Sequence, residues 1–322
     1  MSKTALVTGI TGQDGAYLAE LLLERGYKVY GAQRRNTGVQ HWRLDRLGIT
    51  HDIEFIDFEL NENTNINRVI DKTSPDEIYN LGAQSFVHLS FEQPLYTSDT
   101  NFFGPARILE AIRDSDVKFY QAGTSEMFGK VRDVPQCETT PFYPRSPYGV
   151  AKLAAYWMTV NYRESYNMFA CNGLLFNHES PLRGKEFVTR KLVYNLVKIF
   201  RGDQEFVEMG NMDAQRDWGH AKDYVRAMYL MMQQEAPNDY VIATGETNSI
   251  ETFARTVCNK LDLKYEDVIK INPKFYRPAE VDLLIGDPMK AKLDLNWEPS
   301  YTLDTLIEEM VEEELKYYGY QH

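Results

Sequence analysis

Tyr148 and Lys152 lie four residues apart at the start of a helical stretch, so both side chains are expected on one face of that helix. A tyrosine hydroxyl has an ordinary pKa of roughly 10 and is a weak base at neutral pH, but a neighbouring cation favours its phenolate. We therefore expect Lys152 to lower the pKa of Tyr148 and the two side chains to act as a proton-transfer pair. The same spacing is common on solvent-exposed helix faces, so its interpretation depends on the surrounding elements.

The elements around this pair alternate between short apolar strands and helices. Strands are predicted at residues 4–8, 28–32, 53–57, 77–81, 117–122, 169–176 and 239–243, and helices at 16–25, 66–71, about 96–113 and about 303–317. This order predicts an α/β fold with a Rossmann-type doubly wound parallel sheet. The strand at residues 117–122 ends at Gly123–Glu126, and chemistry in such sheets collects beyond the carboxyl ends of the strands.

The turn after the first strand carries three glycines, Gly9, Gly12 and Gly15, and opens a helix. Glycines let a backbone approach a pyrophosphate closely, and the helix N-terminus offers free N–H groups and the positive end of the helix dipole. The G-x-x-G-x-x-G spacing therefore predicts a turn that binds a dinucleotide.

The second strand leads into Arg34 and Arg35, at the place where an acidic residue would bind the ribose hydroxyls of NAD. Two guanidinium groups suit a 2′-phosphate instead, which favours NADP. After the third strand, Asp57 and Glu59 are both candidates to meet the adenine amino group. Gly82–Ser85, after the fourth strand, is small enough to lie against the cofactor.

Composition narrows the class of protein. The chain has 322 residues, of which 43% are hydrophobic and 25% charged, values that are ordinary for a soluble globular protein. Its net charge of −12 argues against nucleic acid or an anionic membrane as a partner. No apolar run approaches the ~20 residues that span a bilayer. The N-terminus enters a strand without a signal peptide, so we expect a cytoplasmic protein. The three cysteines lack metal-ligand spacing, and no metal is expected.

An anionic small ligand would need a locally basic site in this acidic chain. The polar loops and the helix after residue 176 carry basic side chains that could converge on one: Arg183, Arg190, Lys191, Arg216 and Arg277. Singly, each is more typical of a structural ion pair, so their convergence is the hypothesis.

With these features assembled, the chain resembles the extended short-chain dehydrogenase/reductases and, among them, the GDP-mannose 4,6-dehydratase family, from Thr4 to about Val311. The motifs that carry the resemblance are Gly9–Gly15, Thr124–Gly129, Thr140–Tyr148, Asn177–Pro181, Phe187–Lys191 and Arg216–His220. The last three point to the GDP-mannose enzymes. Gly123 stands where the family pattern has a serine and Gly82 where it has an alanine, so the catalytic set is intact but the sugar pocket could differ.

The resemblance implies a lyase that converts GDP-mannose to GDP-4-keto-6-deoxymannose and water, the first step toward GDP-deoxyhexoses such as GDP-fucose or GDP-rhamnose. A tightly held NADP would take hydride from C4 and return it to C6. By the same resemblance, Tyr148 removes the proton of the 4-hydroxyl, Lys152 holds the nicotinamide ribose and Thr124 binds the sugar oxygen. Glu126 removes the C5 proton, and Ser125 donates a hydrogen bond where related dehydratases carry an aspartate.

The resemblance also implies the binding residues. Cofactor contacts are expected from Gly9, Thr11, Gly12, Gln13, Asp14, Gly15, Arg34, Arg35, Asp57, Glu59, Leu81, Ala83, Gln84, Ser85, Tyr148, Lys152, His178 and Arg183. Substrate contacts are expected from Ser85, Glu126, Asn177, Val188, Lys191, Gly210, Arg216, Arg277 and Glu280. The segment from Arg34 to Arg43 resembles a family loop that reaches a neighbouring cofactor site, which implies a homotetramer, a dimer of dimers.

Two domains are expected. Residues 1–176 and about 213–245 would form the NADP-binding Rossmann domain, and residues 177–212 and about 246–322 a smaller GDP-sugar domain. Two other functions share part of the pattern. A reductase or epimerase on a related nucleotide sugar would need Tyr148 and Lys152 but not Glu126. A non-catalytic NADP-binding sensor would need none of the three, yet this chain has them all.

Overall fold

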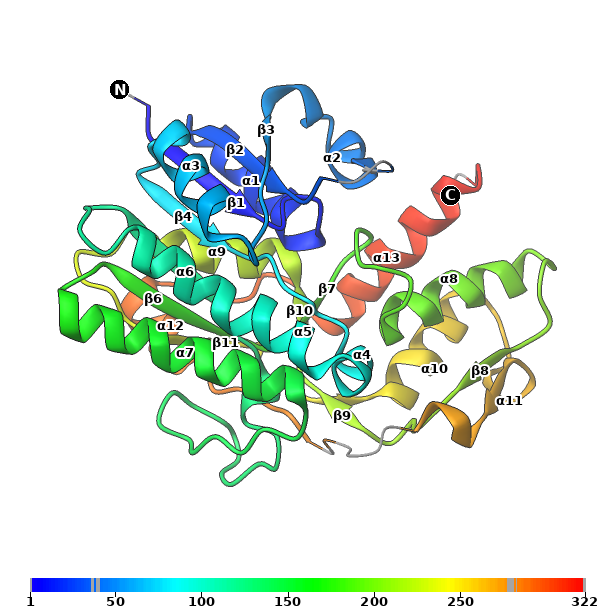
Figure 1. Cartoon of the computed structure of the whole chain (residues 1–322). Helices are drawn as coiled ribbons and strands as arrows, with labels where there is room; N and C mark the ends of the chain where they lie inside the picture. The colour runs from blue at the N-terminus through cyan, green and yellow to red at the C-terminus, as the bar shows by residue number, and fades with distance from the viewer. Residues whose placement is uncertain (1, 36–37, 39–40, 277–280, 282, 321–322) are drawn as a thin grey trace.

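Seven parallel strands form the central sheet, in the order β11-β6-β5-β4-β1-β2-β3 (Figure 1). The computed structural model describes residues 2–35, 38, 41–276, 281 and 283–320. The strands are β1 (Thr4–Thr8), β2 (Lys28–Gln33), β3 (Glu54–Asp57), β4 (Glu77–Asn80), β5 (Lys118–Ala122), β6 (Ala170–Leu175) and β11 (Tyr240–Ile242). Every pairing in this sheet is parallel, so the carboxyl ends of its strands meet at one edge. The predicted Rossmann-type sheet is confirmed.

Helices cover both faces of the sheet because its strands are apolar on both sides. One face packs against α1 (Gln13–Glu24), α9 (Ala221–Met232) and α12 (Met289–Leu295), and the other against α3 (Asn63–Thr73), α6 (Gly104–Ala111) and α7 (Pro147–Tyr166). Along β1, Val7 joins the first of these cores and Leu6 the second, as the two-residue period of a strand requires. The short helix α2 (Trp42–Leu47) and the 3-10 turn η1 (Thr50–Asp52) lie between β2 and β3.

The long helix expected at residues 96–113 is interrupted. The chain forms α4 (Val87–Glu92), α5 (Pro94–Ser98), a π-helical segment η2 (Asp99–Phe103) and then α6. Pro105 has no backbone N–H to donate to residue 101, so the regular helical ladder is broken there. Within the π segment, the buried Asn101 side chain binds both the N–H and the carbonyl of Gln84, at 2.8 and 2.9 Å. Through Asn101, the π-helical segment therefore fixes the loop that follows β4.

A smaller domain packs beside the sheet, on the right of Figure 1. Its helices α8 (Val188–Phe200), α10 (Ile250–Lys260) and α13 (Leu303–Tyr317) share a separate apolar core. Short strands accompany them as three two-stranded pairs: β8 (Val207–Met209) with β13 (Ile269–Ile271), β9 (Gln215–Arg216) with β12 (Asn248–Ser249), and β7 (Asn177–Glu179) with β10 (Trp218–His220). This domain also contains α11 (Tyr265–Val268) and the 3-10 turn η4 (Pro273–Phe275). Another 3-10 turn, η3 (Ser125–Met127), follows β5 of the main sheet.

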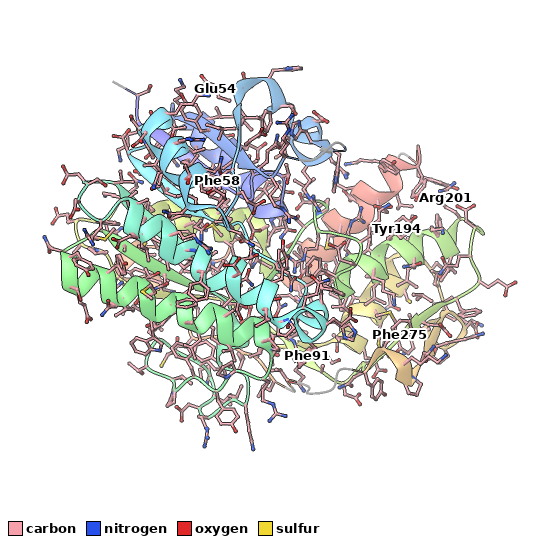
Figure 2. The ribbon with its side chains drawn as sticks, viewed as in Figure 1. Glu54, Phe58, Phe91, Tyr194, Arg201 and Phe275 are labelled. Carbon is pink, nitrogen blue, oxygen red and sulfur yellow. The ribbon has the colours of Figure 1, made fainter. Side chains whose placement is uncertain are left out.

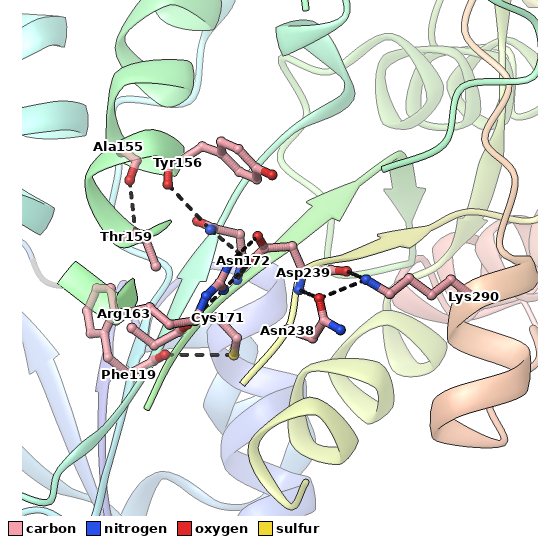
Figure 3. Close-up of polar contacts among 11 residues, drawn as sticks. Phe119, Ala155, Tyr156, Thr159, Arg163, Cys171, Asn172, Asn238, Asp239 and Lys290 are labelled. Carbon is pink, nitrogen blue, oxygen red and sulfur yellow. Dashed lines mark hydrogen bonds and ion pairs between the residues drawn. The ribbon is translucent and has the colours of Figure 1, made fainter. Parts of the chain in front are cut away.

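The chain returns from the smaller domain to complete the sheet, and Asp239 fixes this return (Figure 3). Its carboxylate accepts two hydrogen bonds from the Arg163 guanidinium, both 2.8 Å, and two from the backbone and side-chain nitrogens of Asn172, at 2.8 and 2.9 Å. Lys290 donates to the Asp239 carbonyl at 2.8 Å. Because Arg163 lies on α7 and Asn172 on β6, the late strand β11 is fixed beside β6.

Two kinds of feature are absent from the described part of the chain. None of its helices is both long and apolar enough to cross a membrane. Its His, Cys, Asp and Glu side chains form no group of three or more that could hold a metal ion.

Candidate active site

Tyr148 and Lys152 are buried on the first two turns of α7. The helix begins where Ser146 caps it, with the Ser146 hydroxyl accepting from the N–H of Gly149 at 3.0 Å. A side chain at position 149 would place its Cβ 2.8 Å from the carbonyl oxygen of Glu126. The glycine therefore lets α7 approach the turn after β5, which brings the phenol next to that turn.

The environment of this pair differs from the expectation. Burial lowers the pKa of Lys152 from 10.5 to about 8, against the charge of Asp14, and its ammonium donates to the Ala122 carbonyl at 2.8 Å. Burial raises the pKa of Tyr148 to about 12, while the Thr124 side chain lowers it and the Glu126 charge raises it. The net lowering of the Tyr148 pKa that the sequence suggested is therefore wrong for this structure, because burial of the phenol outweighs the hydrogen bond with Thr124 and the charge of Arg183.

The turn after β5 presents the other catalytic candidates. The Thr124 hydroxyl accepts from the N–H of Glu126 at 3.3 Å and so caps η3. Ser125 is buried beneath the turn. Thr124 and Glu126 line the same cavity as Tyr148, at the carboxyl edge of the sheet. Sequence reasoning placed these side chains together, and the structure does so.

The glycine turn after β1 has the geometry of a pyrophosphate cradle. Gly9 has φ +69, and a Cβ there would lie 2.9 Å from the N–H nitrogen of Gly82. A Cβ at Gly15 would clash with the Gly9 carbonyl and lie 2.7 Å from Cα of Ile10. Gly12 begins α1 without a side-chain cap, so the first N–H groups of the helix point to the cavity edge. These residues fit the diphosphate of a dinucleotide.

A cavity extends from this turn toward the end of β2. Its lining consists of Thr8, Gly9, Thr11, Gly12, Ala32, Gln33, Arg34, Phe58, Leu60, Leu81, Gly82, Ala83 and Ser85. Arg34 is part of this wall and donates to the Tyr96 hydroxyl at 2.7 Å, whereas Arg35 is exposed outside it. Gln33 takes the strand-end position where an acidic side chain would bind the hydroxyls of NAD. Arg34 is therefore the basic side chain at this end of the cavity.

Neither candidate for the adenine contact belongs to this wall. Asn65 holds the turn by accepting from the N–H of Glu59 at 2.7 Å and donating to the Asp57 carbonyl at 3.1 Å. Phe58, between them, is the side chain that lines the cavity. Sequence reasoning missed it because an apolar residue at a strand end is usually part of a core.

A second cavity continues toward Lys152 and Tyr148. It is also lined by Asp14, Leu81, Ala83, Ser85, Ala122, Gly123, Thr124, Ser125, Glu126, Leu175, Phe176, Asn177, His178, Arg183 and Phe187. His178 Nε2 lies 2.8 Å from the Asp14 carboxylate, and its Nδ1 donates to the Phe176 carbonyl at 2.8 Å. Burial opposes charge on the imidazole, but Asp14 outweighs it and the pKa of His178 is raised. A hydrogen-bonded pair of His178 and Asp14 therefore lies beside the expected nicotinamide position.

A third cavity, about 1240 Å³ with its open mouth, lies between the two domains. Its lining includes every described residue that the sequence assigned to the substrate: Ser85, Glu126, Asn177, Val188, Lys191, Gly210 and Arg216. Arg277 and Glu280 lie outside the described residues. The wall also contains residues that were not assigned to substrate: Phe86, Val87, Thr124, Tyr148, Glu179, Arg183, Glu186, Phe187, Met209, Asn211, Ala214, Trp218, Ile250 and Phe275. Most of these lie within two residues of an assigned residue in the chain, and this proximity is the signal that could have identified them.

The basic residues converge only in part. Arg183 lines both this cavity and the one beside Lys152; its guanidinium lies 3.7 Å from the Phe187 ring centre and its Nε lies 3.1 Å from the Glu179 carboxylate. Lys191 and Arg216 line the third cavity as well. Arg190 does not, because it forms a buried ion pair with Glu314 of α13. The hypothesis of a convergent basic site is therefore wrong for Arg190.

Three other assigned residues lie behind the cavity walls. Gln13 and Gln84 are buried and use their side chains on neighbouring segments, and Gly15 packs α1 against the glycine turn. Ser85, by contrast, belongs to all three cavities, which therefore form one cleft. Phe58 lines one end of this cleft in the larger domain and Phe275 the other end in the smaller domain (Figure 2).

Comparison with known proteins agrees with this arrangement. Residues 6–310 match the family model described as GDP-mannose 4,6 dehydratase. The chain is 48% identical to a GDP-mannose 4,6-dehydratase of Vibrio cholerae, covering 98% of this chain and 95% of the relative, and 48% identical to that of Homo sapiens, covering 96% and 90%.

Among solved structures, the chain is similar to a UDP-glucose 4-epimerase of Thermotoga maritima, with TM-score 0.87, 24% identity and coverage of 98% and 99%. It is also similar to a dTDP-glucose 4,6-dehydratase of Bacillus anthracis in complex with NAD, with TM-score 0.85, 20% identity and coverage of 99% and 98%. At these identities the structures show the fold alone.

Proposed function

Because this chain belongs to the GDP-mannose 4,6-dehydratase family, which is a family of hydro-lyases, we propose that it removes water from GDP-mannose to form GDP-4-keto-6-deoxymannose with a bound NADP. The observation that carries the proposal is the shared cavity of Thr124, Glu126 and Tyr148 with the basic residues Lys191 and Arg216. It brings proton-transfer groups and a site for a diphosphate into one space.

The residues divide the reaction between them. A bound NADP would supply the hydride acceptor for C4 of the sugar and the hydride donor for C6. Tyr148 takes the proton of the 4-hydroxyl, and Thr124 holds the same oxygen. A hydrogen on C5 becomes acidic only when C4 is a ketone, so Glu126 removes it after that oxidation. Water then leaves from C6 with the proton that Glu126 took from C5. As hydride returns to C6, C5 takes up a proton, which balances the one that Tyr148 took from the 4-hydroxyl, while Ser125 supports the turn.

The nucleotide is placed in the smaller domain. Arg183, Lys191 and Arg216 bring three cationic side chains to the third cavity, and Glu179 pairs with Arg183 there. Guanidinium and ammonium groups bind diphosphate oxygens through charge-assisted hydrogen bonds. The apolar wall of Met209, Trp218 and Phe275 offers surfaces for a flat base. We therefore assign residues 177–212 and about 246–322 mainly to the GDP-sugar.

NADP is favoured over NAD by two positions. Gln33 cannot accept both ribose hydroxyls as a carboxylate would, and Arg34 lines the cavity at the place of a 2′-phosphate. Binding of each cofactor to the purified protein, measured by calorimetry, tests this choice. Equal or tighter binding of NAD would contradict it.

An oligomer is favoured by an apolar surface on the outer helices. Leu95 on α5 is 84% exposed, and Val150 and Trp157 on α7 are each 55% exposed. The helices α5 and α7 pack together, so these side chains belong to one side of the molecule. A homotetramer, with part of the segment from Arg34 to Arg43 near a neighbouring cofactor, would cover them.

The first experiment incubates the purified protein with GDP-mannose and catalytic NADP, and follows the nucleotide sugar by mass. We expect a loss of one water, with no net change in the redox state of the cofactor. Glu126→Gln should abolish both water loss and C5 proton exchange while binding of GDP-mannose persists. An unchanged substrate mass would overturn the assignment of GDP-mannose. With stoichiometric NADP, a loss of two mass units that is matched by formation of NADPH would favour a dehydrogenase or reductase.

A further inference from the structure

Polar contacts that the reaction itself does not use join the glycine turn to the segment of residues 177–187. Gln13 donates to the His178 carbonyl at 3.1 Å and accepts from the Ser180 hydroxyl at 2.6 Å. The Arg43 guanidinium donates from Nε to the Leu182 carbonyl at 2.6 Å and from a terminal nitrogen to the Thr11 carbonyl at 2.9 Å. We call Gln13, Arg43 and Ser180 the inter-loop bridge.

The bridge lies between the two ligand sites. On one side, Thr11 and Gly12 line the cofactor cavity. On the other side, Asn177 and Arg183 line the sugar-nucleotide cavity and belong to the segment that the bridge holds. None of the three bridge side chains lines any part of the cleft. Gln13, which the sequence assigned to the cofactor, therefore uses its amide on the other loop.

The chemistry of the bridge suits a rigid connection. Gln13 is 6% exposed and Ser180 is fully buried, so their hydrogen bonds do not compete with water. Arg43 is at the end of the segment that resembles the family's intersubunit loop, yet its guanidinium turns back into its own subunit. A planar fork of donors can reach two carbonyls in different segments, whereas a lysine ammonium is a single point.

We propose that Gln13, Arg43 and Ser180 are positioning residues that couple the two sites, so that cofactor on the glycine turn fixes the 177–187 segment in the form that binds the GDP-sugar. This rests on the proposed function. Coupling of this kind is reciprocal, so each ligand must tighten the binding of the other by the same factor. The bridge thereby favours assembly of the ternary complex.

The test measures this factor in the full chain freed of nucleotide. GDP serves as the probe, because it occupies the nucleotide part of the site without turnover, and its Kd is measured by calorimetry with and without saturating NADP. In the wild-type protein we expect NADP to tighten GDP binding roughly 5–150-fold. Arg43→Lys should bring that factor close to one, while the Kd for GDP without NADP changes less than about threefold. Ser180→Ala, which removes one hydroxyl, should lower the factor in part.

Arg46→Lys is the matched control, because Arg46 lies on the same helix and pairs with Glu313 instead of the two loops. It should leave the factor unchanged. A wild-type factor near one, or an unchanged factor in both Arg43→Lys and Ser180→Ala, would overturn the coupling. A parallel loss of affinity for both ligands with the factor intact would show a merely structural role and would also overturn it. Binding of neither ligand to the wild-type protein would instead remove the proposed function on which the inference rests.

Discussion

Lys152 combines two requirements that oppose each other. In the proposed reaction its ammonium must lie beside Tyr148, but its burial disfavours the charge and lowers the pKa to about 8. At neutral pH the side chain is still mostly protonated. The protein therefore retains a buried charge at the site, at the expense of stability, as functional groups often require.

We predict that Lys152→Met abolishes turnover yet stabilises the fold at pH 7. Since the folded pKa of about 8 is below the unfolded value of 10.5, the unfolded state binds more protons, and the penalty is complete below pH 8 and fades between pH 8 and 10.5. Removing this penalty should raise the free energy of unfolding by on the order of 3 kcal/mol, and losing the hydrogen bond to the Ala122 carbonyl should lower it by about 1 kcal/mol. Denaturant unfolding should show a gain of about 2 kcal/mol at pH 7 that vanishes near pH 10. The exposed Lys130→Met should show no such pH dependence; equal destabilisation by Lys152→Met at both pH values would contradict the argument.

For single residues, the sequence indicated which side chains form the candidate site but not how the surrounding protein changes their pKa values. The spacing of Tyr148 and Lys152 and the strand end before Thr124 were sufficient to bring the catalytic candidates together. The raised pKa of Tyr148 was not predictable, because it depends on how closely α7 approaches the turn after β5, and that approach depends on tertiary packing. Phe58 was missed for a related reason, since an aromatic side chain carries no mark of lining a cleft.

Among the elements, α1 packs closely against the glycine turn at its N-terminal end and has free space beyond its C-terminal end. Gly15 has no room for a Cβ, whereas Gly26, just beyond the helix, has φ +77 and nothing within 4 Å of a Cβ. We predict that Gly15→Ala shifts α1 off the glycine turn and weakens NADP binding more than tenfold, measured by calorimetry. Gly26→Ala should cost about 1 kcal/mol of stability from its left-handed backbone and leave NADP affinity unchanged. Similar NADP affinities in the two variants would exclude a role for the close approach at Gly15.

The junction between α8 and α13 is a buried ion pair between Arg190 and Glu314. We predict that Arg190→Met lowers the free energy of unfolding by about 3–5 kcal/mol, because it leaves a buried carboxylate without its partner. The double variant Arg190→Met with Glu314→Leu should recover most of that loss, since two apolar side chains can replace a buried pair. Urea unfolding measures both, and a double variant no more stable than the single one would contradict this account.

The large elements followed from sequence periodicity, and the small ones did not. The seven strands of the main sheet and α13 were predicted within one or two residues. The paired strands of the smaller domain have only two or three residues, too few for a period to be visible. The π-helical interruption before α6 was also missed, because the helical pattern of residues 96–113 continues through it.

For the molecule as a whole, the apolar surface over α5 and α7 is the feature that points beyond one chain. We predict that Leu95→Asp lowers the molar mass measured by light scattering, because a carboxylate would be buried in the subunit contact. Leu293→Asp is the control, since Leu293 is 74% exposed but lies on α12, which covers the other face of the sheet. A wild-type protein that is already monomeric, or a Leu95→Asp protein of unchanged mass, would contradict the proposed oligomer.

The division of the chain between the two domains could be predicted only in part from the order of the elements. The return of strand β11 to the sheet could be predicted from its apolar run. The position of α12 could not, because its residues Ala291 and Leu295 pack in the core of the larger domain although β13 and α13, the elements before and after it, pack in the smaller one.

Strand β11 comes about seventy residues after its partner β6 in the sequence, and this separation has a consequence during synthesis. While the ribosome makes the smaller domain, β6 is an open parallel edge, and the Asn172 and Arg163 side chains that will meet Asp239 have no acidic partner there. At bacterial or eukaryotic elongation rates of ~5–20 residues per second, this edge waits for several seconds. Nascent chains stalled before residue 239 should therefore aggregate or recruit chaperones, and chains released beyond Lys290 should not.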